Sequence, residues 1–156
     1  MKVLKFIDEQ FEKWFLIVMV LVTFIQIVLR WFNAATVWAE EFSRYVMLYQ
    51  VWVGASYAVH EDAHIRITAL IGKLSGGRRR GMDLVVLTLW LLFALWLTVE
   101  GCVLVGKIAA MGQVSSAMRI PMTIPYASVP IGGALMTIRL VQKIVERLRN
   151  TQEEEA

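Results

Sequence analysis

Most residues that could do chemistry in this chain flank one long uncharged run, residues 45–59. Glu40, Glu41 and Arg44 precede it, and the segment 60–66 (HEDAHIR) follows it. Carboxylates beside a cation form ion pairs, and two histidines in one short segment suggest a metal or haem site. Charged residues at the end of an apolar helix are costly in a bilayer unless they are paired or buried in protein. These residues therefore predict a site of assembly, where charges pair within or between proteins.

The acidic residues before the run have the spacing of a helical ion pair. Glu40 lies four residues before Arg44, the favourable order for such a pair, and Glu41 lies three residues before Arg44 and could share it. Both acids belong to the first turns of a helix, where the helix dipole favours negative charge. Three interpretations stay open: a buried pairing site, a solvated cluster at the membrane surface, and a proton relay.

The histidines and the cysteine do not complete a cofactor site. His60 and His64 are the two histidines of the chain, and a transmembrane haem normally takes ligands that face each other from different helices. Cys102 is the single cysteine, so one chain cannot build a disulfide or a thiolate metal site from it. The sequence also shows no Ser/His/Asp set and no phosphate-binding loop. We therefore expect no enzymatic activity, no cofactor and no metal site.

The elements that position these residues are long apolar helices. The chain is 58% hydrophobic and 19% charged, and its charge-free runs cover 14–29, 45–59, 84–99 and 120–138. With their flanks, these runs reach the roughly 20 residues that a helix needs to cross a bilayer. We predict an all-α integral membrane protein whose single domain, 1–156, has four transmembrane helices and a cytoplasmic tail, 142–156. The predicted spans are about 14–32, 39–60, 82–105 and 121–141. For the first run, a cleaved signal peptide is the alternative, but no small-residue cleavage pattern follows it.

Basic residues predict the orientation of the four spans. If the N-terminus is inside, the inner segments contain Lys2, Lys5, Lys13, Arg66, Lys73, Arg78, Arg79, Arg80, Arg139, Lys143, Arg147 and Arg149. The outer segments then contain only Arg30, Arg44, Lys107 and Arg119. Cytoplasmic loops carry the excess of Lys and Arg, so both termini are expected in the cytoplasm. The same asymmetry accounts for the net charge of +3 without a nucleic-acid partner.

Three further segments have informative patterns. In the inner loop 63–81, four apolar residues share one helical face, which predicts a short interfacial helix; a plain polar loop is the alternative. In the last span, Pro121 and Pro125 suit the first turn, whereas Pro130 lies inside and predicts a kink or a close helix contact. Glu100 and Lys107 share a face near the outer end of the third span, where they pair across helices or snorkel.

One face of the second span combines charged and small residues. On a helical wheel Glu40, Arg44, Met47, Gly54 and Ala58 fall within about 60° of one direction. Gly54 and Ala58 form a small-xxx-small pair, which allows another helix backbone to approach closely. The charged residues thus continue a packing face along the span, and the helix that covers it belongs either to this chain or to a partner.

Two groups of residues resemble the small transmembrane (Q-type) subunit of the tripartite ATP-independent periplasmic (TRAP) transporters. The first group is Trp38, Glu40-Glu41-x-x-Arg44, Trp52, Gly54-Ala55 and His64-Ile65-Arg66-Ile67. The second group is Pro121, Tyr126, Pro130, Gly132 and Leu135-Met136-x-Ile138-Arg139. With four spans and both ends inside, the resemblance extends over nearly the whole chain.

The resemblance implies a multi-pass subunit of the bacterial inner membrane that steadies a larger multi-helix permease. That permease carries the substrate and sodium sites, and a periplasmic binding protein delivers a small organic acid to it. The residues expected at helix-packing or partner interfaces are Glu40, Glu41, Arg44, Met47, Gly54, Ala58, His64 and Pro130. Two other classes remain as alternatives: a small exporter that works as a homodimer, and the membrane anchor of a redox complex.

Overall fold

The computed structural model of this chain describes residues 2–32, 37–60 and 77–155. Its long helices are α1 (Lys2–Trp31), α2 (Val37–His60), α4 (Gly77–Met111) and α6 (Ser128–Glu155), and the short helix α5 (Thr123–Tyr126) precedes α6. Apart from turns and one isolated β-bridge, the described residues are helical. His64 and most of the loop expected to hold an interfacial helix, up to residue 76, lie outside the described residues.

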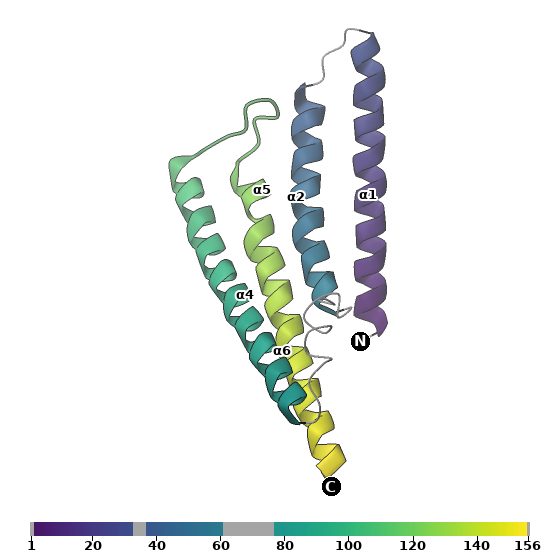
Figure 1. Cartoon of the computed structure of the whole chain (residues 1–156). Coiled ribbons are helices and arrows are strands. Elements are labelled where there is room, and N and C mark those ends of the chain that lie inside the picture. Colours follow the sequence, from purple (N-terminus) through teal and green to yellow (C-terminus); the bar gives the residue numbers. More distant parts are fainter. Residues whose placement is uncertain (1, 33–36, 61–76, 156) are drawn as a thin grey trace.

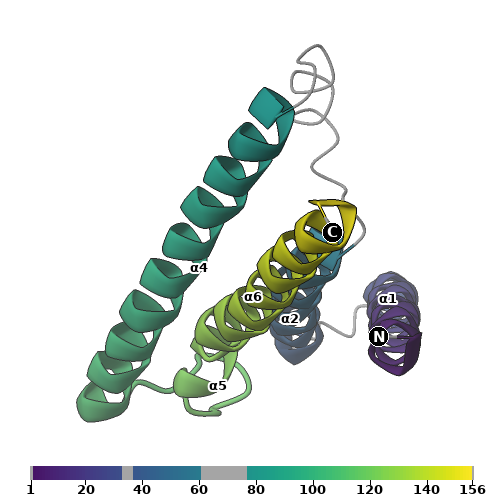
Figure 2. The ribbon, with the colours of Figure 1, turned by 90° about the horizontal axis from the view of Figure 1, so that it is seen from below.

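The four long helices stand in an open row. α6 packs against α4 on one side and α2 on the other, and α2 also packs against α1. In the described part of the chain α1 touches neither α6 nor α4, so the row does not close into a bundle (Figures 1 and 2). The helices alternate in direction, which places both chain termini at the same end of the row (Figure 1).

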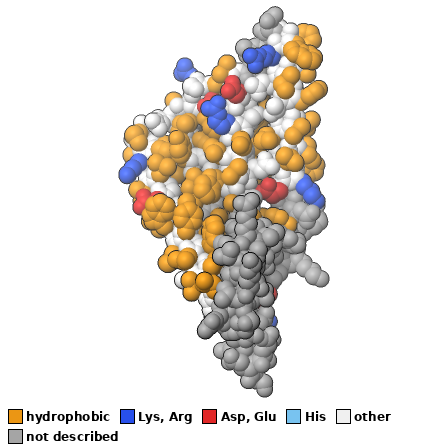
Figure 3. All heavy atoms as spheres, in the orientation of Figure 1, with side chains coloured by type: hydrophobic (Ala, Val, Ile, Leu, Met, Phe, Trp, Pro, Cys, Tyr) orange, Lys and Arg blue, Asp and Glu red, His pale blue; other side chains and the backbone are white. Residues whose placement is uncertain are grey.

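Large apolar side chains cover the outside of this row. Phe24, Leu92 and Trp96 are all more than half exposed, and orange apolar patches cover much of the visible face (Figure 3). Three described segments are long and apolar enough to cross a membrane: Gln10–Trp31, Gly81–Met111 and Thr123–Arg147. A soluble protein rarely exposes so much contiguous apolar surface. The chain is therefore a multi-pass membrane protein whose exposed helix faces are suited to lipid or partner helices.

Helix α2 has the length of a membrane span but is less apolar than the other long helices. Its 24 residues extend over about 36 Å. It is not among the segments apolar enough to qualify, and it contains polar residues such as Gln50 and Ser56. Because α2 lies between α1 and α6, protein covers part of its polar surface, and Ser56 is fully buried.

The last long helix begins later than the sequence predicts. Pro121 was expected in its first turn but instead pairs with Val114 in a β-bridge, while Pro125 lies in α5. Because α6 begins at Ser128, Pro130 is its third residue, where the missing N–H costs no intrahelical hydrogen bond. Pro130 is therefore not an interior helix breaker.

The helices also extend beyond the predicted spans. α1 begins at Lys2, α4 covers Gly77–Met111, and α6 continues to Glu155. The segments that extend α1 at its start and α6 at its end are rich in lysine, arginine, glutamate and glutamine, which favour helix formation without being apolar. The outer extension of α4, residues 106–111, contains a single charged residue, Lys107. A charge-free run thus marks the apolar part of a helix and not its ends.

Glycines set the close contacts of α6 in the middle of the row. A Cβ on Gly132 would lie 2.6 Å from the Cβ of Trp52 in α2, and one on Gly133 would lie 2.6 Å from Oγ1 of Thr98 in α4. Gly101 of α4 in turn faces the ring of Pro130, with 3.1 Å from its hypothetical Cβ to the proline Cδ. Close helix contact, one of the two outcomes expected around Pro130, is therefore what the structure shows.

Candidate functional site

Residues 112–122, between α4 and α5, form a short hairpin-like loop. Ser115 N–H donates to the Ile120 carbonyl (2.8 Å), and Met122 N–H donates to the Gln113 carbonyl (2.9 Å). At the tip, Arg119 has φ of 53°, in the left-handed region, which costs a non-glycine residue about 1–2 kcal/mol. Such a conformation persists only where surrounding contacts hold it.

The carboxylate of Glu41 supplies those contacts. Its Oε2 accepts hydrogen bonds from the backbone N–H groups of Ala117 (3.0 Å) and Met118 (2.9 Å), and its Oε1 accepts one from the Tyr45 hydroxyl. Hydrogen bonds to a charged group are shorter and stronger than neutral ones. Glu41 therefore ties the tip of the loop to the beginning of α2.

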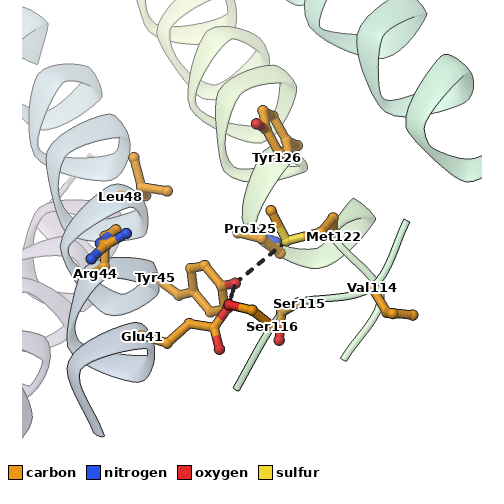
Figure 4. A pocket seen from close by; sticks show the side chains of 10 residues that line it. All are labelled: Glu41, Arg44, Tyr45, Leu48, Val114, Ser115, Ser116, Met122, Pro125 and Tyr126. Carbon is orange, nitrogen blue, oxygen red and sulfur yellow. Dashed lines mark hydrogen bonds between the residues drawn. The ribbon is translucent and has the colours of Figure 1, made fainter. Parts of the chain in front are cut away.

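Two tyrosines of α2 extend this connection towards α5. The Tyr45 hydroxyl also lies 3.4 Å from Sδ of Met122, and the Tyr49 hydroxyl donates to the Ile124 carbonyl (2.7 Å). Figure 4 shows Glu41, Tyr45 and Met122 converging between α2 and the loop. We call the end of the row that contains this cluster the Glu41 end, and the opposite end, where α2 finishes, the Val59 end.

Glu40 and Arg44 form the ion pair predicted from their spacing. Their side-chain atoms are 3.3 Å apart, and the two side chains are 64% and 67% exposed. The possibility that Glu41 shares Arg44 is not realised, because neighbouring helical residues point about 100° apart and Glu41 faces the loop instead. The two adjacent acids thus have different tasks: Glu40 pairs on the surface, and Glu41 holds the loop.

A pocket of about 450 Å³ opens between α2 and the loop. The α2 wall carries Glu41, Arg44, Tyr45 and Leu48, and the opposite side includes Ser115 of the loop (Figure 4). Carboxylate, guanidinium and hydroxyl groups here can bind a polar segment or a small polar molecule. Within the described ranges, no group of three or more His, Cys, Asp or Glu residues could hold a metal.

The face predicted on the second span divides into two parts. Met47 is 54% exposed, and Glu40 and Arg44 are also open, so none of the described helices covers that half. Gly54, in contrast, faces α1, where its hypothetical Cβ would lie 3.1 Å from the Glu12 carboxylate, and Ala58 is half-buried. The helix opposite Gly54 thus belongs to this chain.

A basic stripe of Arg139, Lys143 and Arg147 lies along α6 at the Val59 end; these residues were predicted on the inner side, but their contacts with other helices were not. Lys143 Nζ donates to the Val59 carbonyl (2.9 Å), and Arg147 lies 3.7 Å from Asp83 of α4. Arg139 lies on the same helix, one turn before Lys143 and two turns before Arg147, and is 7% exposed. The spacing of these residues, four apart on one helix, is the signal that could have identified them.

The tripartite ATP-independent periplasmic transporter DctQ component is the family whose model matches residues 19–150. The C4-dicarboxylate TRAP transporter small permease protein DctQ of Rhodobacter capsulatus is 29% identical over 68% of this chain and 47% of its own length. The protein of that name from Vibrio cholerae is 28% identical over 87% of this chain and 68% of its own length.

A longer relative is the isethionate TRAP transporter permease protein DctMQ of Oleidesulfovibrio alaskensis. It is 25% identical over 94% of this chain, which covers 25% of the relative. This chain thus spans about a quarter of the length of the Oleidesulfovibrio alaskensis relative and about half of the length of the Rhodobacter capsulatus relative. The family match extends over most of the chain and includes the Glu41 cluster, Pro130 and the basic stripe, so the chain belongs to the DctQ component family of the TRAP transporters.

Proposed function

We propose that this chain is the small membrane subunit of a TRAP-type transporter and acts as a scaffold for a large permease subunit. The open row of helices is the observation that carries this proposal. Each helix leaves at least one apolar face uncovered, and α1 and α4 do not close on each other in the described chain. Such a layer is suited to lie along a larger membrane protein, with lipid on its remaining surface.

The proposed topology has four spans, with the Glu41 end in the periplasm and both termini in the cytoplasm of the inner membrane. Alternating helix directions support it, because the ends of α2 and α6 and the starts of α1 and α4 lie together (Figure 1). Lys143, Arg147 and Arg149 are at that shared end, as expected for a cytoplasmic side. In this topology α2 also crosses the membrane, in addition to the three more apolar segments, and α1 and α6 partly cover its polar groups.

The proposed activity of the whole transporter is sodium-coupled uptake of a small organic acid. Relatives of this chain are named for C4-dicarboxylates, isethionate and sialic acid, all of which are acids. A periplasmic binding protein would deliver the substrate to the permease. The loop fixed by Glu41 would give this subunit a rigid periplasmic surface within that assembly.

Purification and reconstitution test the proposed role. The tagged chain should bring down a large permease from its native membrane, and uptake into liposomes should require this chain, the permease and the binding protein under a sodium gradient. A chain that purifies as a homodimer and transports by itself would instead be a small exporter. A bound haem spectrum would instead indicate a redox anchor.

Single-cysteine labelling tests the topology separately. With Cys102 replaced by serine, Gln113→Cys at the Glu41 end and Glu146→Cys at the Val59 end form a matched exposed pair. A membrane-impermeant maleimide should label intact spheroplasts at residue 113 and not at residue 146. The reverse labelling would show that the orientation is inverted.

A further inference from the structure

Glu100 lies off the face of α4 that packs against α6, the one long helix in contact with α4 among the described residues. Ala94 and Gly101 of α4 are buried and lie on the face towards α6, where Ala94 shares a core cluster with Met136 and Leu140 and Gly101 contacts Pro130. At 100° per residue, Glu100 lies about 120° from the direction of Ala94. It is exposed, as are Phe93 and Trp96 on the same side. The carboxylate is thus on an outer surface of the row.

This carboxylate also lies deep along the helix. The sequence placed Glu100 near the end of a span finishing at about residue 105, but α4 continues to Met111. Eleven residues from Glu100 to Met111 correspond to about 16 Å of helix. The neighbouring contacts, Gly101 with Pro130 and Thr98 with Gly133, belong to the middle of the row, where Gly132 meets Trp52. Glu100 thus lies inside Gly81–Met111, the segment of α4 that is long and apolar enough to cross a membrane, and well short of its outer end.

Nothing in the described chain compensates the charge of Glu100. No hydrogen bond or ion pair joins it to another described residue, and Lys107, on nearly the same face, is two turns away along the axis. Lys107 lies four residues from the helix end and can extend its long side chain to the surface. The short side chain of Glu100 cannot cover about 16 Å, and a carboxylate facing lipid at this depth is costly.

We propose that a transmembrane helix of the large permease packs along the stripe of α4 that contains Leu89, Phe93, Trp96, Glu100 and Lys107. At the level of Glu100 this helix presents a basic side chain or another hydrogen-bond donor, which compensates the buried carboxylate. This inference rests on the proposed function. It adds which face of which helix meets the permease and what chemistry the permease brings there.

The permease is a better occupant of this stripe than a second copy of the chain. In a membrane, two copies related by a two-fold axis along the membrane normal place identical residues at equal depth. Two Glu100 carboxylates would then meet, with each Lys107 about 10 Å away along the axis. In addition, the relative DctMQ, of which this chain covers a quarter, is named as a single permease protein.

Photo-crosslinking in the intact complex tests the position of the stripe. A benzophenone amino acid replaces Trp96, on the stripe, or Leu95, its neighbour on another side of the helix; both native side chains are exposed (59% and 43%). The Trp96 position should crosslink to the permease several-fold more than the Leu95 position. Equal crosslinking, or adducts only between copies of this chain, would overturn the inference while the complex still co-purifies.

Variants of Glu100 test the chemistry. Glu100→Leu should lower recovery of the permease about three- to tenfold, the range of an interhelical hydrogen bond in a membrane, whereas Glu100→Gln should retain part of it. The isolated Glu100→Leu chain should be at least as stable as the wild type, because a costly carboxylate is removed. Thr88→Leu, at an exposed site on another side of α4, is the matched control.

The outcomes separate the two proposals. If Glu100→Leu leaves recovery of the permease unchanged, the carboxylate has no role at the interface and the inference fails. If the wild-type chain itself brings down no permease, the proposed function fails first. Loss of recovery together with loss of stability in the isolated chain would indicate a structural role within the row and would also overturn the inference.

Discussion

Charged residues of opposite sign hold the helices at the two ends of the row: an acid at one end and basic residues at the other. At the Glu41 end an acid in the first turns of α2 receives three hydrogen bonds, two of them from a loop 76 and 77 residues away. At the Val59 end basic residues of α6 reach the Val59 carbonyl in the last turn of α2 and Asp83 of α4. Both arrangements agree with the helix dipole, which favours acids where α2 begins and cations where it ends.

The two ends differ in which parts of the chain their charged residues hold and in the length of the contacts. Glu41 concentrates its bonds on one loop at 2.9–3.0 Å, whereas the Arg147–Asp83 contact is 3.7 Å long and its arginine is 51% exposed. The Glu41 end is therefore a shaped surface, and the Val59 end consists of separate helix-to-helix ties. Removing one residue should disturb the first end more than the second.

The largest effect is expected in the middle of the row, on which both ends depend. Gly132→Ala should destabilise the chain by about 1–3 kcal/mol, because its new Cβ overlaps the Cβ and backbone of Trp52. Gly54→Ala is the matched control and should cost less than about 1 kcal/mol, since it meets only the movable carboxylate of Glu12. Unfolding by SDS titration in mixed micelles measures both. Equal effects would contradict a packing centre at Gly132.

Loss of the Glu41 carboxylate should release the loop at that end. In Glu41→Ala the N–H groups of Ala117 and Met118 lose their acceptor, and trypsin should cleave after Arg119 about tenfold faster because local opening becomes easier. Glu40→Ala, which removes the neighbouring exposed acid, should leave cleavage nearly unchanged. Equal acceleration in the two variants would show that net charge, and not the clamp, protects the loop.

A smaller effect is expected from the lysine at the opposite end. Lys143→Met removes the donor to the Val59 carbonyl and should destabilise the last turn of α2 by about 0.5–1 kcal/mol. Hydrogen exchange of the amides of residues 57–59 should accelerate, while that of residues 41–45 should not. Lys143→Arg should restore most of the protection. Acceleration over all of α2 would instead point to a packing defect.

The smallest effect should come from the long ion pair at the same end. Arg147→Gln should change stability by less than about 0.5 kcal/mol, since partly exposed pairs contribute little. The same SDS titration measures this change, with Asp83→Asn as the second variant of a double-mutant cycle. A coupling energy between Arg147 and Asp83 larger than the loss of stability in Lys143→Met would show that the ion pair is the stronger of the two contacts at the Val59 end.

Much of the fold follows from the sequence, but the helix ends and partners do not. Charge-free runs locate four long helices, yet Pro121, Pro125 and the extension to Glu155 show that apolarity does not define where a helix begins or ends. The Glu40–Arg44 pair is predictable because both residues belong to one helical turn. The role of Glu41 is not, because its donors come from a distant loop whose backbone direction no local pattern determines.

By itself the sequence determined that this is a helical membrane protein, because hydrocarbon thickness and helical rise constrain the length and composition of each span. Its match to the family model over residues 19–150 also placed it in the DctQ component family. Only the tertiary structure decided that the helices form an open row, that α1 lies against Gly54, and that the described helices leave Met47 and Glu100 exposed. The physical reason is that apolar helix faces are interchangeable in composition. Their pairing depends on where small residues such as Gly101, Gly132 and Gly133 allow two helices to approach closely.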